Sequence, residues 1–290
     1  MRSLKRKEGP ARESGVHYDR ITDLWIRLMG PDFHFGYYAG KGGGLEEAAA
    51  ELVRQLAEAV PLRGGERVLD LGCGVGAPAL HLARHYGCTV TGVTNSGRGA
   101  ERARELARRE GVEGVEFVEA DALDEGAAPG PFDVVWVMES SHSIGDLPAL
   151  MKRAFGALVE GGSLALCDLV QVGKLPFTKA FFSFVRGLPG AFAVARAFGP
   201  ARIYPLGSYC QEAVRAGFRA IKVREISDEV FPTLRNWRER GSRMWEEAGE
   251  GETRRYLEDF IRACRSLEAV FRQGVMGYML FVAHKPRAGR

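Results

Sequence analysis

The sequence predicts an α/β fold: a doubly wound, mostly parallel sheet of seven strands, with helices on both faces and a helical cap or lid. From residue 68 onward, short apolar runs alternate with amphipathic segments of helical period, a pattern typical of parallel sheets. A glycine-rich turn at residues 72–76 joins the first apolar run to the first of these helices. Ligands of such sheets bind at the carboxyl ends of the strands, so the residues after each strand are the candidates for a functional site.

Local patterns predict each element in turn. Apolar positions at helical spacing predict helices over residues 17–30 and 45–60, the second ended by Pro61 and Gly64-Gly65. Apolar runs predict strands at residues 68–71, 89–94, 115–119, 132–138, 163–169, 218–226 and 275–283. The intervening segments predict helices that end near residues 86 and 110, and helices over 147–159, 209–216 and 232–273. Gly161-Gly162 is a stop signal after the helix at 147–159.

Asp70 stands two residues before the glycine turn and limits which ligands the turn could bind. A carboxylate there repels a pyrophosphate but attracts an ammonium or sulfonium group, and S-adenosylmethionine carries both cations and no phosphate. A dinucleotide-binding site is the alternative to an S-adenosylmethionine site, because the Gly-x-Gly-x-x-Ala spacing of residues 72–77 fits the dinucleotide-binding fingerprint. That fingerprint includes an acidic residue about 20 residues after the glycines. Here the second strand instead leads into Asn95 and Ser96. The residues therefore favour S-adenosylmethionine over NAD(P).

Polar residues follow three more of the predicted strands. After the third strand, Asp121 is placed to accept a hydrogen bond from an adenine amino group, with the backbone of Ala122 beside the ring, although a simple turn aspartate is the alternative. After the fourth strand comes His142, whose imidazole titrates near neutrality and suits a general base. Asp168, near the end of the adjacent fifth strand, would orient it. The pair is predicted to be catalytic, against the alternative of a hydrogen-bonded loop histidine.

Composition limits the classes of partner. The net charge of +3 over 290 residues is too small to indicate a nucleic acid, and no apolar run approaches the ~20 residues of a membrane span. The five cysteines include no CxxC motif, which argues against a disulfide framework or zinc site and favours a cytoplasmic setting. His81 and His85 lie four residues apart without a third ligand, so we expect no metal. We expect an apolar small-molecule acceptor as partner, and the sequence leaves a homo-oligomer open.

The chain is expected to divide into five parts. They are a flexible basic tail (1–16), an N-terminal helical cap (17–66), a cofactor-binding core (67–170), an apolar lid (171–215) and the C-terminal part of the core with a helical insertion (216–290). Six phenylalanines between residues 175 and 200, divided by glycine and proline, suggest the lid. Plain core packing explains the same pattern nearly as well.

The LDLGCGxG motif at residues 69–76 resembles that of class I S-adenosylmethionine-dependent methyltransferases, which have a Rossmann-like fold. The MESxH motif at 138–142 and VTNS at 93–96 narrow the resemblance to a small-molecule group. That group contains ubiquinone, tocopherol and sterol methyltransferases and rebeccamycin-type sugar O-methyltransferases. The resemblance covers residues 17–170 well and 205–285 loosely.

The resemblance implies roles for matching residues. His142 and Asp168 stand where the sugar methyltransferase has its catalytic pair, and the FGYY segment at 35–38 matches an aromatic segment that closes over the cofactor. Gly99 replaces a glutamine that often contacts the ribose, so Asn95 or Ser96 would supply that contact. The candidate cofactor residues are Asp70, Gly72, Cys73, Gly74, Asn95, Ser96, Asp121, Ala122, Glu139 and Tyr37. The candidate substrate pocket consists of Tyr18, His34, Phe181, Phe184 and Tyr204.

Together these observations predict a methyltransferase of bacterial specialised metabolism that acts on a hydroxyl of an apolar small molecule, with His142 as general base. One alternative is methylation of a prenyl or quinone-like carbon, where Glu139, His142 or Tyr37 would stabilise a cation or remove a proton. Another is a cyclase of the same fold that uses the cofactor only structurally. A non-enzymatic binding protein is a further reading, and loss of methyl transfer with retained cofactor affinity would support it.

Overall fold

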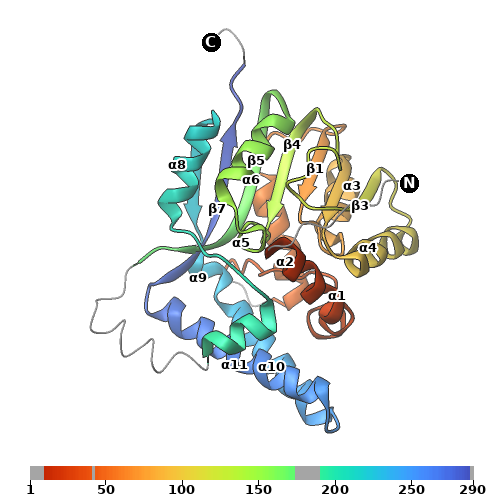
Figure 1. Cartoon of the computed structure of the whole chain (residues 1–290), viewed down its shortest axis with the longest axis vertical. Coiled ribbons are helices and arrows are strands. Elements are labelled where there is room, and N and C mark those ends of the chain that lie inside the picture. The colour runs from red at the N-terminus through yellow and green to blue at the C-terminus, as the bar shows by residue number, and fades with distance from the viewer. Residues whose placement is uncertain (1–9, 41–42, 174–189, 288–290) are drawn as a thin grey trace.

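The computed structural model describes residues 10–40, 43–173 and 190–287. Its centre is one seven-stranded sheet in the order β3-β2-β1-β4-β5-β7-β6 (Figure 1). The strands are β1 (Arg67–Leu71), β2 (Thr89–Thr94), β3 (Val115–Glu119), β4 (Phe132–Met138), β5 (Leu158–Gln171), β6 (Arg219–Glu225) and β7 (Met276–His284). Only β7 pairs antiparallel with its neighbours, β5 and β6. The predicted doubly wound, mostly parallel sheet is therefore confirmed.

Both faces of the sheet are covered because its central strands are mostly apolar. Successive residues of β4 point to opposite faces: Val134 and Trp136 belong to one buried cluster, and Val135 and Val137 to the other. The first cluster includes residues of α2 (Leu45–Ala57), α3 (Ala77–Tyr86) and α4 (Gly97–Glu110), and the second includes residues of α6 (Leu147–Ala157) and α8 (Leu206–Ala216). This is the layered arrangement expected of a parallel sheet.

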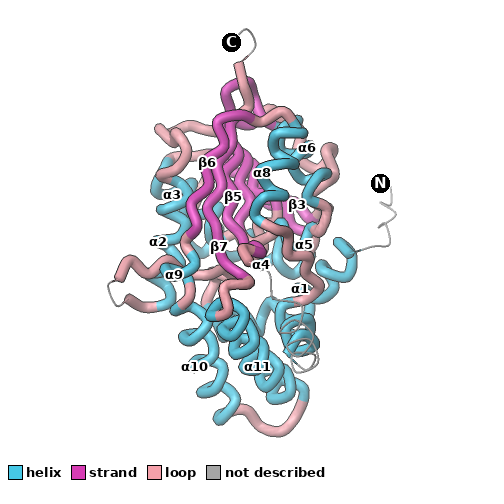
Figure 2. Tube along the Cα trace, turned by 90° about the vertical axis from the view of Figure 1, so that its left-hand side faces the viewer, coloured by secondary structure: helices cyan, strands magenta, loops and turns pink. Residues whose placement is uncertain are grey.

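A helical cap lies beyond one end of the sheet. It contains α1 (Pro10–Met29), α10 (Pro232–Glu247) and α11 (Glu252–Arg272), which gather below the strands in both views (Figure 2). A helical segment at residues 190–198 joins them. There the ring of Phe198 packs 5.8 Å from Trp25 and 5.4 Å from Phe260. No helix in the described chain is both long and apolar enough to cross a membrane.

The first helix corrects one prediction. α1 begins at Pro10, so residues 10–16 are helical and do not belong to the flexible tail predicted for 1–16. Tertiary contacts rather than apolar periodicity hold this end, because a Cβ on Gly15 would lie only 2.6 Å from the carbonyl oxygen of Asn95. Further along α1, Asp19 accepts a hydrogen bond of 2.7 Å from the Ser96 hydroxyl. The helix is thereby fixed against the end of β2.

The C-terminal half contains a second difference. β5 begins at Leu158, before the predicted residue 163, and runs through the glycine pair predicted to stop the preceding helix. Leu158 already pairs with Phe132, and the register then shifts before Val134 pairs with Ser163. Two short helices, α5 (Ser141–Ile144) and α9 (Ser227–Val230), follow β4 and β6. Much of the predicted lid, including Phe181 and Phe184, lies outside the described residues.

Candidate active site

The glycine turn between β1 and α3 is shaped by close packing. Gly72, Gly74 and Gly76 all have positive φ, at 91°, 54° and 81°. A Cβ on Gly72 would lie 2.3 Å from the Cβ of Ser140, and one on Gly76 would lie 2.6 Å from the ring of Phe117. No described atom lies within 4 Å of a Cβ built on Gly74. Glycine is therefore required at the two outer positions by sterics and at the middle one by backbone conformation.

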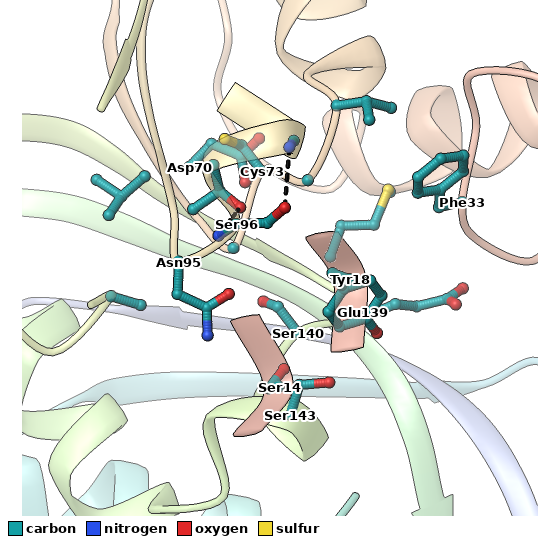
Figure 3. A pocket seen from close by; sticks show the side chains of 18 of the residues that line it. Ser14, Tyr18, Phe33, Asp70, Cys73, Asn95, Ser96, Glu139, Ser140 and Ser143 are labelled. Atoms are coloured by element: carbon teal, nitrogen blue, oxygen red, sulfur yellow. Dashed lines mark hydrogen bonds between the residues drawn. The ribbon is translucent and has the colours of Figure 1, made fainter. Parts of the chain in front are cut away.

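A cavity opens beside this turn at the carboxyl ends of β1, β2 and β4 (Figure 3). Its empty space is about 970 Å³, with solvent at the mouth included. Helix α1 contributes Ser14, Tyr18 and Thr22 to the wall, and the segment after α1 contributes Phe33 and His34. Every predicted cofactor residue except Tyr37 lines it: Asp70, Gly72, Cys73, Gly74, Asn95, Ser96, Asp121, Ala122 and Glu139.

Asp70 places an unsatisfied carboxylate oxygen in this wall. The residue is 2% exposed, and its Oδ2 has no hydrogen-bond partner among the described residues. Burial raises the pKa of Asp70 to about 7, although the nearby His34 opposes the rise. A buried carboxylate without a partner costs free energy until a cationic group pairs with it. The site therefore fits a ligand that brings an ammonium group to the glycine turn.

Glu139 is the second buried acid of the wall. Its Oε1 accepts hydrogen bonds from the backbone N–H of Phe35 at 2.7 Å and from the hydroxyl of Tyr278 at 2.6 Å. Burial raises the pKa of Glu139 to about 7, while His34 and these two donors oppose the rise. The backbone φ of Glu139 is 49°, a conformation that costs a non-glycine residue about 1–3 kcal/mol. Such strain is typical of positions that a site requires.

The residues after β2 and β3 complete the wall. The hydroxyl of Ser96 accepts from the N–H of Gly99 at 2.8 Å, which caps α4, and donates to Asp19. Asn95, the other residue predicted to contact the ribose, also lines the cavity. Asp121 Oδ1 accepts from the N–H of Leu123 at 2.9 Å, and the residue stays exposed at the cavity. Its turn role and an adenine contact are compatible, since Oδ2 is not used in that bond.

His142 and Asp168 form the predicted pair. Nδ1 of His142 donates to Oδ1 of Asp168 at 2.7 Å, and the His142 backbone N–H donates to Oδ2 at 3.2 Å. Oδ2 also accepts from the hydroxyl of Ser141, which lies 2.7 Å from the hydroxyl of Tyr209. Burial lowers the pKa of His142, but the Asp168 carboxylate outweighs it and raises that pKa above its ordinary value. Because Nδ1 carries the proton in this bond, Nε2 is the basic nitrogen of the neutral ring.

The dyad stands beside the cavity rather than in its wall. Asp168 is fully buried, while the His142 side chain is 12% exposed. Ser140 and Ser143, on either side of His142 in the chain, line the cavity, and His142 itself does not. α5 thus connects the dyad to the cavity through one turn of helix.

The structure does not bring two of the predicted residues to the cavity. Tyr37 is half-buried against the hydrophobic core, with the guanidinium of Arg224 5.4 Å from its ring centre. Tyr204 donates its hydroxyl to the carbonyl of Gly145 at 2.7 Å and so holds the end of α5. Tyr18 and His34, predicted for the substrate pocket, do line the cavity. Within the described ranges, no group of three or more His, Cys, Asp or Glu side chains is arranged to hold a metal ion.

Several site residues were missed by the sequence analysis. Phe33 lines the cavity and lies beside the aromatic FGYY segment at residues 35–38, so the aromatic composition there could have identified it. Ser143 carried the weaker signal of following His142. Tyr278 reaches Glu139 and Tyr209 reaches the Ser141 hydroxyl from distant elements, and nothing in their local sequence marks them. Their roles depend on which strands and helices become neighbours in space.

Comparison with known proteins places this geometry in a family. The family model described as mycolic acid cyclopropane synthetase matches residues 5–281. Among curated proteins, 27-O-demethylrifamycin SV methyltransferase of Amycolatopsis mediterranei is 32% identical over 275 residues, which cover 94% of this chain and 97% of that protein.

Solved structures share the fold over nearly the whole chain. The [4+2]-cyclase SpnF has a TM-score of 0.80 at 25% identity, covering 99% of this chain and 100% of its own. The mycolic acid cyclopropane synthase CmaA1, complexed with SAH and CTAB, has a TM-score of 0.84 at 19% identity, covering 97% of this chain and 100% of its own. The second likeness supports the fold alone.

Proposed function

The chain belongs to the mycolic acid cyclopropane synthetase family of class I S-adenosylmethionine-dependent methyltransferases, and from this premise we propose that it methylates a hydroxyl group of a small natural product, with His142 as general base. S-adenosylmethionine is the cofactor and supplies an electrophilic methyl group on a sulfonium. The observation that supports the proposal most is the buried hydrogen bond between His142 and Asp168 beside the cofactor cavity. Its 27-O-demethylrifamycin relative is named for an O-methylation.

The cavity wall offers a partner for each part of the cofactor. Asp70 would take the ammonium of the amino-acid tail, and the glycine turn would let that tail approach the backbone. Asn95 would contact the ribose, and Asp121 with Ala122 would contact the adenine. Each assignment uses a residue whose side chain or backbone lines the cavity.

His142, held by Asp168, would accept the proton that the acceptor hydroxyl loses. Asp168 holds the Nδ1–H of His142, so the lone pair of Nε2 would take the proton of the acceptor hydroxyl as its oxygen gains the methyl group and the sulfonium leaves as a neutral thioether. The imidazolium that results is stabilised by the buried carboxylate. Ser141 and Tyr209 keep that carboxylate in place through the Ser141 hydroxyl. Methyl transfer otherwise needs alignment of the reacting groups and exclusion of water.

Aromatic packing in the cap supports an apolar acceptor. Trp25 makes edge contacts with Tyr18, Phe33 and Phe198, at ring separations of 5.6, 5.3 and 5.8 Å. Tyr18 and Phe33 of this cluster line the cavity. An apolar framework with a hydroxyl at one end matches such a wall better than a highly charged molecule does.

One observation favours a second candidate, methylation of an alkene carbon. Glu139 lines the cavity in a strained conformation, whereas His142 lies beside it. A carboxylate facing the cofactor would stabilise a carbocation formed when an alkene takes the methyl group. The family's name fits that chemistry, and the likeness to SpnF keeps a cyclase of the same fold as an outcome to test.

A screen with radiolabelled S-adenosylmethionine separates these candidates. The acceptors are hydroxylated macrocycles, beginning with 27-O-demethylrifamycin SV, and prenyl or alkenyl lipids. We expect label on an oxygen, and His142→Ala should lower turnover by about 10²–10⁴ without weakening S-adenosylhomocysteine binding. His85→Ala serves as the matched control, because His85 is exposed and outside the site. Label on carbon, or undiminished turnover in His142→Ala, would overturn the O-methylation proposal.

A further inference from the structure

Three buried side-chain atoms in the cavity wall lack a hydrogen-bond partner among the described residues. They are Nε2 of His34, Oδ2 of Asp70 and Oγ of Ser143. The neighbouring hydroxyls of Ser140 and Ser141 are engaged, the first by the carbonyl of Leu71 at 2.6 Å. Buried polar atoms are normally paired in native proteins, so unpartnered ones in a cavity wall mark where a ligand is expected.

His34 is held in one orientation and favoured as a cation. The residue is 4% exposed, and its Nδ1 donates to the carbonyl of Phe35 at 2.7 Å. Oδ1 of Asp32 lies 3.5 Å from Nε2, too long for a strong hydrogen bond. Burial lowers the pKa of His34, but the carboxylates of Asp32 and Glu139 outweigh it and raise that pKa. Because Nδ1 already donates to Phe35, protonation of the ring would place its second N–H on Nε2, free to donate to a ligand.

The charged side chains of the cavity wall are opposite in sign to the charged groups of the cofactor. Its buried acids are Asp70 and Glu139, and among the described residues that line the cavity His34 is the one side chain able to carry a positive charge. S-adenosylmethionine carries two cations, the ammonium and the sulfonium, and one anion, the carboxylate. His34 and Asp70 line the same cavity, and the charge of His34 opposes the rise in the pKa of Asp70. The ammonium and the carboxylate of an amino-acid tail, joined through one carbon, carry the charges that complement this pair.

We propose that His34 binds the carboxylate of the cofactor's amino-acid tail while Asp70 binds its ammonium. His34 is then a cofactor residue rather than the substrate-pocket residue that the sequence predicts. The inference deepens the proposed function and rests on its cofactor, not on the choice of acceptor. The rival holder of the carboxylate is the backbone at the start of α3, where Gly74 and Val75 line the cavity.

Calorimetric titration with two ligands tests the proposal. The ligands are S-adenosylhomocysteine and its carboxylate-free analogue 5′-deoxy-5′-(3-aminopropylthio)adenosine. In His34→Phe, which keeps a planar ring without charge, affinity for S-adenosylhomocysteine should fall on the order of 10- to 100-fold. Affinity for the analogue should change by less than about threefold, because it has no group for His34 to bind. His34→Gln, with a neutral donor, should recover part of the loss.

The outcomes are distinguishable. Equal weakening of both ligands, or no weakening of either, would overturn the role of His34 and leave the carboxylate to the backbone of the turn. Failure of the wild-type protein to bind S-adenosylhomocysteine at all would instead contradict the cofactor site as a whole. Melting temperatures of the variants confirm that the compared proteins are folded.

Discussion

Replacing Asp168 by asparagine removes one charge from the dyad and one of its two acceptor oxygens. The carboxylate is fully buried and accepts four hydrogen bonds, two of them from His142 and one each from Ser141 and Leu169. The amide is nearly isosteric, but it keeps only one acceptor oxygen. His142 therefore retains a neighbour of the same size while losing the anion that stabilises its protonated ring.

The magnitude follows from the hydrogen bond that loses its charge. A bond of 2.7 Å between a ring N–H and a buried carboxylate is charge-assisted, and such bonds contribute about 1.5–3 kcal/mol. At 1.36 kcal/mol per factor of ten, turnover in Asp168→Asn should fall by about 10- to 150-fold. The Ser141→Ala variant is the matched control, because it removes one hydrogen-bond donor to the Asp168 carboxylate and keeps the negative charge. Its loss should be smaller.

The pH dependence gives an independent measurement. A general base must be neutral, so turnover rises with pH through the pKa of His142, which Asp168 holds above its ordinary value. In Asp168→Asn burial is no longer outweighed by that carboxylate, so the acid limb should move to lower pH. NMR titration of the ring in the protein without acceptor gives the same pKa directly. The chain has six histidines, and a His142→Gln spectrum assigns the signal.

Two results would refute this reasoning. An unchanged His142 pKa in Asp168→Asn would mean that the carboxylate does not stabilise the imidazolium. An unchanged turnover combined with a lowered pKa would mean that His142 titrates but is not the base. Affinity for S-adenosylhomocysteine should stay within about threefold of wild type in this variant, since Asp168 does not line the cavity.

Further predictions concern the cofactor cavity. Asp70 has a pKa of about 7 and must be ionised to bind an ammonium, so calorimetric affinity for S-adenosylhomocysteine should fall below pH 7 by up to about tenfold per unit and level off above it. Asp70→Asn should bind weakly without that slope, whereas persistence of the slope would assign it to another group. Gly72→Ala should lower the free energy of unfolding by more than about 2 kcal/mol, because φ strain adds to a contact 2.3 Å from Ser140. Gly65 has a φ of 89°, and no described atom lies within 4 Å of a Cβ built on it. Gly65→Ala is therefore a control for φ strain alone. If chemical denaturation shows equal losses of unfolding free energy in the two variants, the steric contribution at Gly72 is contradicted.

The central strands of the sheet were predictable because they are mostly apolar runs, and strand burial follows from that composition. The dyad was predictable for a related reason. Met138 and Cys167 are paired in register across β4 and β5, so the residues after them reach the same edge. One turn of α5 then brings His142 back over Asp168.

Features set by tertiary packing were not predictable in this way. The start of α1 has no apolar period, and the contacts of Gly15 and Asp19 with the end of β2 fix it instead. Tyr37 lies in the expected segment, but its ring turns toward Arg224 on a strand far along the chain. Tyr278 reaches Glu139 because β7 inserts between β5 and β6, an order that local patterns do not specify.

A crystal structure with S-adenosylhomocysteine tests the central claim most directly. The account predicts the amino-acid tail over the glycine turn at residues 72–76, with its ammonium within about 2.7–3.2 Å of the Asp70 carboxylate. A tail bound elsewhere, with Asp70 still unpartnered beneath an empty turn, would contradict the electrostatic basis of the site.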